Sequence, residues 1–178
     1  MFTVEEALQR LLSQAHPLQD VKTVATLDAY DRVLAEAVVS PVAVPPMDNS
    51  QMDGYAVRCA DVTTVPTTLA VSQRIAAGQV GAPLAPGTAA RIFTGAPLPA
   101  GADAIVMQEA TTLDGDRVTI NEVPRAGQWI RRVGIDIQAD STILAAGRKL
   151  RPQDVGLAAS VGTAKLKVVR RLRVAVFF

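Results

Sequence analysis

The sequence predicts an α+β fold in which a mostly-β domain of short strands, residues 45–141, is inserted into a discontinuous α+β domain, residues 1–44 and 142–178. Apolar residues follow a helical period near the start of the chain and again after Pro152. Between those regions the period disappears, and short β-prone runs alternate with glycine and proline. With 178 residues, 49% of them hydrophobic, the chain can form one or two domains with a real core.

The first expected element is a helix that begins at Thr3. Thr3 and Glu6 have the spacing of a capping box, in which each side chain satisfies a backbone N–H of the first turn. One apolar stripe follows at helical spacing: Val4, Ala7, Leu8, Leu11, Leu12 and Ala15. Pro17 marks the limit of this helix.

A second helix is expected from Asp28, a good N-cap, with Tyr30, Val33, Leu34 and Ala37 on its apolar face. The β-branched run over 38–44 predicts an extended segment that Pro45-Pro46 ends. In the middle of the chain, strands are expected within 67–75, 90–95, 102–110 and 117–123. Asp114-Gly115 lies between the last two of them and is a good hairpin turn.

A further helix is expected from Pro152, which suits a first helical position, to Gly162, a plausible C-cap. The run KLKVVRRLRVAVFF (165–178) alternates and ends in five apolar residues, a pattern typical of a strand covered on both faces. We therefore expect the natural protein to continue beyond Phe178. The alternative is a terminal strand that this domain or a dimer partner covers.

Composition argues against several classes of function. A net charge of +1 and no aromatic residues within the basic run 165–173 argue against a nucleic-acid binder. The single cysteine, Cys59, rules out an intrachain disulfide and a cysteine zinc site. The single histidine, His16, precedes a proline, so histidine-based acid–base chemistry is not expected. Without a signal peptide or an apolar run of about 18 residues, we expect a cytoplasmic protein with no membrane contact.

The segment PPMDNSQMDGYAVR (45–58) is the first candidate site. Its double proline restricts the backbone, while Asn49-Ser50 and Asp53-Gly54 are turn formers. Asp48 and Asp53 could coordinate a hard cation, position an anion through water or take a proton. The alternative is a well-anchored structural loop whose aspartates only cap turns.

Two further segments contain candidate residues. In RIFTGAPLPAGADAIVMQE (91–109), Gly95 after Thr94 would let a ligand approach backbone N–H groups, although an ordinary wide turn is the alternative. In IRRVGIDI (130–137), Arg131 and Arg132 offer guanidinium forks for an oxyanion, and Asp136 could orient an arginine. A solvated charged strand is the alternative there.

Taken together, these three segments resemble the N-terminal region of the molybdopterin molybdenumtransferases, the MoeA family, which includes the E domain of gephyrin. Their order and spacing match, as do the expected N-terminal helices and the helix LRPQDVGLAASVG (150–162). The chain differs from the usual family pattern at Ile135, where an acid is common, although Asp136 is kept. The resemblance covers essentially the whole chain.

The resemblance implies an enzyme that inserts molybdate into adenylylated molybdopterin with a divalent cation such as Mg²⁺, releasing AMP and the molybdenum cofactor. It also implies an elongated homodimer and a following pterin-binding α/β domain that this chain lacks, so we expect the chain alone to be inactive. The family's catalytic cleft lies between that domain of one subunit and the N-terminal region of the other.

By the same resemblance, Asp53 and Thr94 are the expected catalytic residues, and Asp48 is a weaker candidate. Arg131, Asp136, Ser50 and Gly95 are the expected substrate-binding residues. No metal ligand is assigned. The alternative function is a non-catalytic dimerisation or scaffold module, because no complete site lies within these residues.

Overall fold

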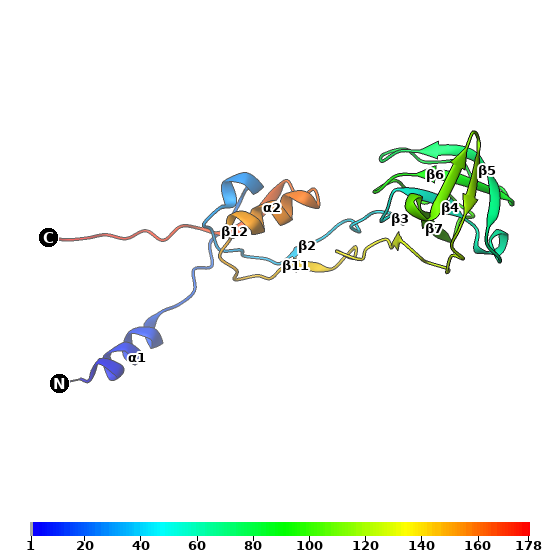
Figure 1. Cartoon of the computed structure of the whole chain (residues 1–178). Helices are drawn as coiled ribbons and strands as arrows, with labels where there is room; N and C mark the ends of the chain where they lie inside the picture. The colour runs from blue at the N-terminus through cyan, green and yellow to red at the C-terminus, as the bar shows by residue number, and fades with distance from the viewer. Residues whose placement is uncertain (1) are drawn as a thin grey trace. The chain divides into compact units, whose positions relative to one another are not determined.

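The computed structural model describes residues 2–178, which are mainly strands with a few helices. The chain divides into two compact units (Figure 1). One comprises the chain up to Pro41 together with Ser141–Phe178, and the other comprises Val42–Asp140.

The Val42–Asp140 unit is built on a six-stranded sheet of order β7-β4-β6-β5-β9-β8 (Figure 1). Its strands are β4 (Gly54–Val57), β5 (Thr67–Ile75), β6 (Thr88–Ile92), β7 (Ala104–Met107), β8 (Thr111–Asp114) and β9 (Arg117–Ile120). Only β5 and β6 pair in parallel. Each strand expected from the sequence is present. The predicted hairpin turn lies one residue later, at Gly115-Asp116, because Asp114 is the last residue of β8 and pairs with Arg117. This turn joins β8 to β9, whereas the sequence predicted that it joins the strands within 102–110 and 117–123.

Apolar side chains cover both faces of this sheet. Tyr55 and Val57 of β4 belong to a buried cluster with Val106, whereas Ala56 between them belongs to a second cluster with Ile105. This division follows from the alternation of successive side chains across a strand. Burial on both faces fixes the central strands, and therefore the residues at their ends.

Short elements join this sheet to the candidate segments. Strand β3 (Asn49–Ser50) pairs antiparallel with β10 (Ile130–Arg131). Two 3₁₀ turns, η2 (Cys59–Asp61) and η3 (Gln108–Ala110), follow the sheet strands β4 and β7.

Among its described residues, the other unit contains two pairs of strands and two α-helices. Strand β1 (Val21–Ala25) pairs with β12 (Lys165–Val169), and β2 (Val38–Val39) pairs with β11 (Thr142–Leu144), both antiparallel. Helix α2 (Pro152–Ser160) begins at Pro152 as predicted. The buried core of this unit consists of Ala29, Leu34, Val38, Leu144, Leu150, Val155, Ala158, Leu166 and Val168.

The second helix predicted from Asp28 is wrong. Thr26–Ala29 form a single 3₁₀ turn, η1, and Asp31 then adopts a left-handed backbone with φ 61°. The Leu34 N–H donates to the Arg148 carbonyl at 2.9 Å, and the Leu150 N–H donates to the Arg32 carbonyl at 2.7 Å. Pairing with a distant segment therefore satisfies the backbone that a helix would have used, and tertiary context overrides the local pattern.

The predicted strand over 165–178 is shorter than expected. Strand β12 ends at Val169, with Leu166 and Val168 buried. The later apolar residues of that run, including Leu172, Val174 and Val176, are exposed. The alternative of a terminal strand covered by its own domain is therefore wrong for these residues.

Helix α1 (Val4–Gln14) is confirmed with its capping box. The Glu6 N–H donates to Thr3 Oγ1 at 3.2 Å, and the Thr3 N–H donates to Glu6 Oε2 at 2.9 Å. None of its residues is buried, and the apolar stripe is exposed at Val4, Leu8, Leu11 and Leu12.

Within residues 2–178, no helix combines the length and the apolar character that crossing a membrane requires.

Candidate functional site

Asp53 and Thr94 meet at one end of the central strands. Asp53 directly precedes β4, Thr94 lies just after the end of β6, and Gln108 follows β7. Because β4 runs antiparallel to both neighbours, its start lies beside their ends. The Gln108 N–H donates to the Asp53 carbonyl at 3.1 Å, which fixes the backbone at this point.

The Asp53 carboxylate is held through one of its oxygens. Its Oδ1 accepts from the Thr94 amide at 2.8 Å and from the Thr94 hydroxyl at 2.7 Å. These bonds, the amide first, lower the pKa of Asp53, with a smaller contribution from the Arg91 charge and opposition from partial desolvation. Asp53 Oδ2 accepts no hydrogen bond from the described part of the chain. The site therefore offers an ionised carboxylate with one oxygen available to a ligand.

Arg91 is a site residue that the sequence reasoning missed. Its guanidinium donates to the Gly54 carbonyl at 3.0 Å and to Gln108 Oε1 at 2.5 Å. It also lies over the rings of Phe93 and Tyr55, at 4.5 and 5.3 Å from their centroids. The available signal was strand alternation, which puts Arg91 and Phe93 of RIFTG on one face.

Ser50 and Gly95 connect the two loops of this site through their backbones. The Gly95 N–H donates to the Ser50 carbonyl at 2.9 Å, so that amide is already used. The Ser50 side chain is buried, and its hydroxyl donates to the Met52 carbonyl of its own loop. Gly95 has φ +80°, and no atom lies within 4 Å of the place where a Cβ would stand. A ligand could thus approach the backbone at Gly95, although its N–H is engaged.

Asp48 holds the 130–136 segment against the same loop. Its Oδ1 accepts from the Val133 amide at 2.8 Å, and its Oδ2 accepts from Arg132 at 2.6 Å. These contacts, the Val133 amide first, lower the pKa of Asp48. With both oxygens engaged, Asp48 serves as a brace between the two segments.

Arg131 and Asp136 form an ion pair with each other on an exposed surface. Arg131 belongs to β10, where it pairs in register with Asn49 of β3. The three candidate segments thus meet around residues 48–50, because Ser50 contacts both the Gly95 turn and β10. The catalytic and binding roles of these residues stay predictions.

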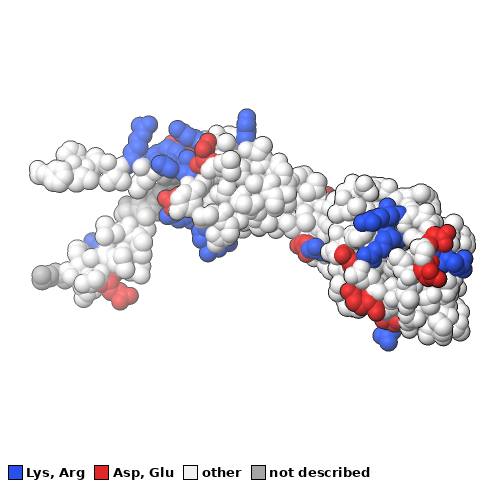
Figure 2. Space-filling view, turned by 45° about the horizontal axis from the view of Figure 1, so that its top comes forward, with Lys and Arg blue, Asp and Glu red and all other residues white. Residues whose placement is uncertain are grey.

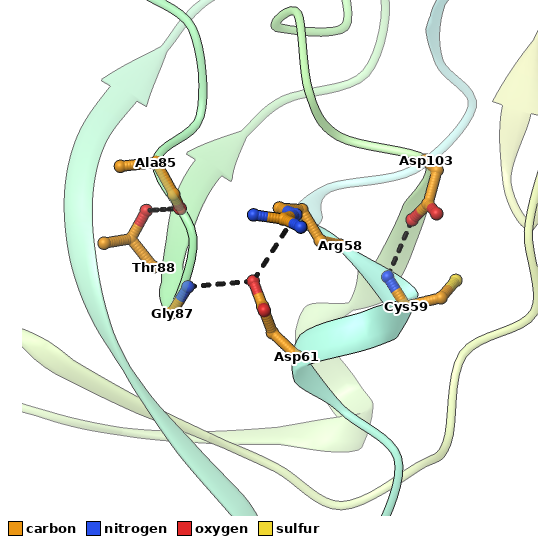
Figure 3. Close-up of polar contacts among 7 residues, drawn as sticks. All are labelled: Arg58, Cys59, Asp61, Ala85, Gly87, Thr88 and Asp103. Atoms are coloured by element: carbon orange, nitrogen blue, oxygen red, sulfur yellow. Dashed lines mark hydrogen bonds and ion pairs between the residues drawn. The ribbon is translucent and has the colours of Figure 1, made fainter.

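At the opposite end of the same strands, two aspartate side chains, Asp61 and Asp103, accept hydrogen bonds from the backbone of neighbouring loops (Figure 3). The Cys59 N–H donates to Asp103 Oδ1 at 2.7 Å, and the Gly87 N–H donates to Asp61 Oδ2 at 2.8 Å. Each carboxylate thus links two loops. In residues 2–178, no three His, Cys, Asp or Glu side chains come together as a metal site would require.

Comparison with known proteins gives the family. Residues 2–162 match the family model described as MoeA N-terminal region (domain I and II). The chain belongs to the MoeA N-terminal region family. It is 39% identical over 178 residues to the molybdopterin molybdenumtransferase of Haemophilus influenzae, covering 99% of this chain and 44% of that protein. It is 45% identical over 159 residues to molybdopterin molybdenumtransferase 2 of Mycobacterium tuberculosis, covering 86% and 39%.

The MoeA fold is also present in a solved structure. The crystal structure of the molybdopterin biosynthesis moeA protein from Pyrococcus horikoshii OT3 superimposes with a TM-score of 0.87 and 34% identity. That superposition covers 92% of this chain and 45% of the other. The chain thus spans about two fifths of the length of these MoeA relatives.

Proposed function

We propose that this chain is the N-terminal region of a molybdopterin molybdenumtransferase, the enzyme that inserts molybdate into adenylylated molybdopterin and releases AMP. The family match over residues 2–162 carries this proposal, since the named relatives are molybdopterin molybdenumtransferases. Because the chain spans about two fifths of those relatives, we propose that turnover also needs the remainder of their length.

Asp53 is the proposed centre of this chain's contribution. With a lowered pKa it is ionised at neutral pH, and it is therefore a weak base and a poor proton donor. Its available oxygen suits a positioning role, in which it accepts a hydrogen bond from a substrate or faces a cation. Thr94 then fixes the rotamer of that carboxylate through two donors.

A magnesium ion does not fit the described residues alone. Asp48 has both oxygens engaged, Asp136 is paired with Arg131, and Asp53 could supply at most one ligand. Magnesium prefers six oxygen ligands in near-octahedral geometry. A Mg²⁺ requirement is therefore part of the proposal for the whole enzyme only.

The proposal is tested on the full gene product with Asp53→Asn. We expect molybdate insertion to fall by about 100-fold, the effect of losing a positioned group at a reaction centre. Asp116→Asn is the control, because Asp116 is an exposed aspartate of the same unit that lies in the β8–β9 turn. Wild-type insertion by Asp53→Asn would remove Asp53 from the site, and no insertion by the wild-type product would overturn the proposed activity.

We also propose that the enzyme is a cytoplasmic homodimer with a composite cleft, built on a discontinuous α+β domain and an inserted β-rich domain. The exposed apolar stripe of α1 supports an assembling protein, since such stripes are usually covered in the functional state. The same observation favours the second candidate function, a non-catalytic dimerisation or scaffold module. Light scattering on the full gene product tests the dimer, and its insertion activity separates the two functions.

A further inference from the structure

Arg74 lies beside the candidate site, and its guanidinium forms no ion pair within residues 2–178. It is in register with Arg91 on the parallel strands β5 and β6, so both side chains leave the same face of the sheet. Each guanidinium carbon lies 4.5 Å from the centroid of the Phe93 ring. Arg91 is tied to the Gly54 carbonyl and to Gln108, but the Arg74 side chain has no ion pair or hydrogen bond within residues 2–178.

Two arginines at neighbouring cross-strand positions repel each other unless something compensates their charge. The Phe93 ring supplies part of that compensation through its negative face. The negative charge of Asp53 attracts Arg91. No carboxylate forms an ion pair with Arg74 in the described chain. Figure 2 shows one group of Lys and Arg side chains on the Val42–Asp140 unit, and further places where acidic and basic side chains adjoin. The charge of Arg91 is therefore partly balanced by Asp53, whereas the charge of Arg74 has no counter-ion among the described residues.

We propose that Arg74 and Arg91 bind a tetrahedral oxyanion next to Asp53 and Thr94. Guanidinium groups bind such oxyanions through paired N–H donors, and Arg74 offers all five of its own. Arg91 retains further N–H groups beyond its two bonds. The anion is either molybdate or a phosphoryl group, and this choice rests on the proposed function.

The Phe93 ring restrains both guanidinium groups of this site. A free arginine side chain loses rotamer entropy when it binds, and a ring that already restrains the guanidinium reduces that loss. Phe93 is half-buried, and it restrains Arg74 and Arg91 together. The site is therefore partly formed before an anion arrives.

The test is isothermal titration calorimetry on the 178-residue chain, with molybdate, inorganic phosphate and AMP as three separate titrants. We expect Arg74→Gln to weaken binding by about tenfold, which corresponds to losing a charge-assisted hydrogen bond. The affinity of Arg74→Lys should lie between those of the wild-type chain and Arg74→Gln, because lysine keeps the charge but lacks the planar pair of N–H donors. Arg117→Gln is the matched control, an exposed arginine on β9 of the same sheet.

The anion is identified as the titrant that binds the wild-type chain most tightly and whose binding is weakened by Arg74→Gln. If no titrant binds, or if Arg74→Gln and Arg117→Gln bind as the wild-type chain does, the inference is overturned. Equal losses in Arg74→Gln and Arg117→Gln would also overturn it, because they would reflect net charge only. None of these outcomes measures insertion, so a failure here is distinct from a failure of the proposed activity.

Discussion

Thr94 donates both its amide and its hydroxyl to the same oxygen of Asp53, at 2.8 and 2.7 Å. The two residues are 41 positions apart, and strands β4 and β6 bring them together. The buried core of the sheet therefore fixes the orientation of the carboxylate. Its second oxygen is left available to a ligand.

Loss of the Thr94 hydroxyl should raise the pKa of Asp53 toward its usual value of about 3.9. In Thr94→Ala the amide still donates, so the shift is partly retained. Because the folded pKa is lowered, the pair stabilises the fold above the usual pKa, and this stabilisation is lost as pH falls through the folded value. Carboxyl carbon NMR titration measures the change.

Thr94→Ser is the control for this measurement, since it keeps both donors and should titrate as the wild-type chain does. Identical titration curves for Thr94→Ala and the wild-type chain would show that the hydroxyl contributes nothing to the pKa of Asp53.

Gly54→Ala should strongly destabilise the Val42–Asp140 unit. A Cβ at Gly54 would stand 2.0 Å from the Val106 carbonyl oxygen, which belongs to the neighbouring strand β7. Since backbone cannot move aside cheaply, we expect a loss of about 3 kcal/mol in the free energy of unfolding. Urea unfolding measures it.

Gly156→Ala is the contrasting variant, because a Cβ there meets no atom within 4 Å in helix α2. It should leave its unit unchanged or stabilise it by about 0.5–1 kcal/mol. If Gly54→Ala unfolds at the wild-type urea concentration, the close approach of β4 and β7 is not as described.

The sequence predicted the elements whose signals are local. The capping box at Thr3 and Glu6 and the start of α2 at Pro152 depend on neighbours a few residues away, and both are confirmed. The hairpin turn is also a local signal, and it lies one residue after the predicted place, at Gly115-Asp116. The helix from Asp28 failed because its backbone pairs with residues 147–150, which no local pattern reveals. Strand β8 was missed because Thr111–Asp114 is mostly polar and exposed.

The candidate site shows the same division. The three segments were found from their unusual density of charged and turn-forming residues, and the structure joins them around Ser50. The contact between Asp53 and Thr94, and the place of Arg91 beside them, depend on strand order. Strand order comes from long-range pairing, so it could not be read from spacing.

Asp154 should make the stability of the α2 unit depend on acid pH. Asp154 is 3% exposed, and its carboxylate accepts from Arg148 at 2.8 Å and from the Arg151 amide at 2.9 Å. The Arg148 bond first, then the Arg151 amide, lower its pKa to about 2. The resulting stabilisation is complete above a pH of about 4 and is lost as pH falls toward 2. Thermal unfolding between pH 2 and 5 measures this loss.

Asp154→Asn should have a lower Tm than the wild-type chain at pH 5, with a smaller difference near pH 2. Asp28→Asn, an exposed aspartate of the same unit, should follow the wild-type curve. A wild-type pH dependence in Asp154→Asn would assign the acid sensitivity to another group.

The Cys59 thiol should react slowly with alkylating reagents. Desolvation, followed by the neighbouring Asp103 carboxylate, raises the pKa of Cys59 to about 11 (Figure 3). At pH 8 that leaves about a hundredfold less thiolate than a thiol with a pKa of about 9, and the thiolate is the reactive form. Alkylation by iodoacetamide, followed by mass spectrometry from pH 7 to 11, measures the pKa.

Asp103→Asn should lower the pKa of Cys59 and speed alkylation at pH 8, because the negative charge is gone while the desolvation stays. Asp114→Asn, at an exposed aspartate that ends β8, is the control and should leave the rate unchanged. Fast alkylation of the wild-type chain at pH 8 would contradict a raised pKa. If Asp103→Asn and the wild-type chain react equally slowly, desolvation alone suppresses the thiolate.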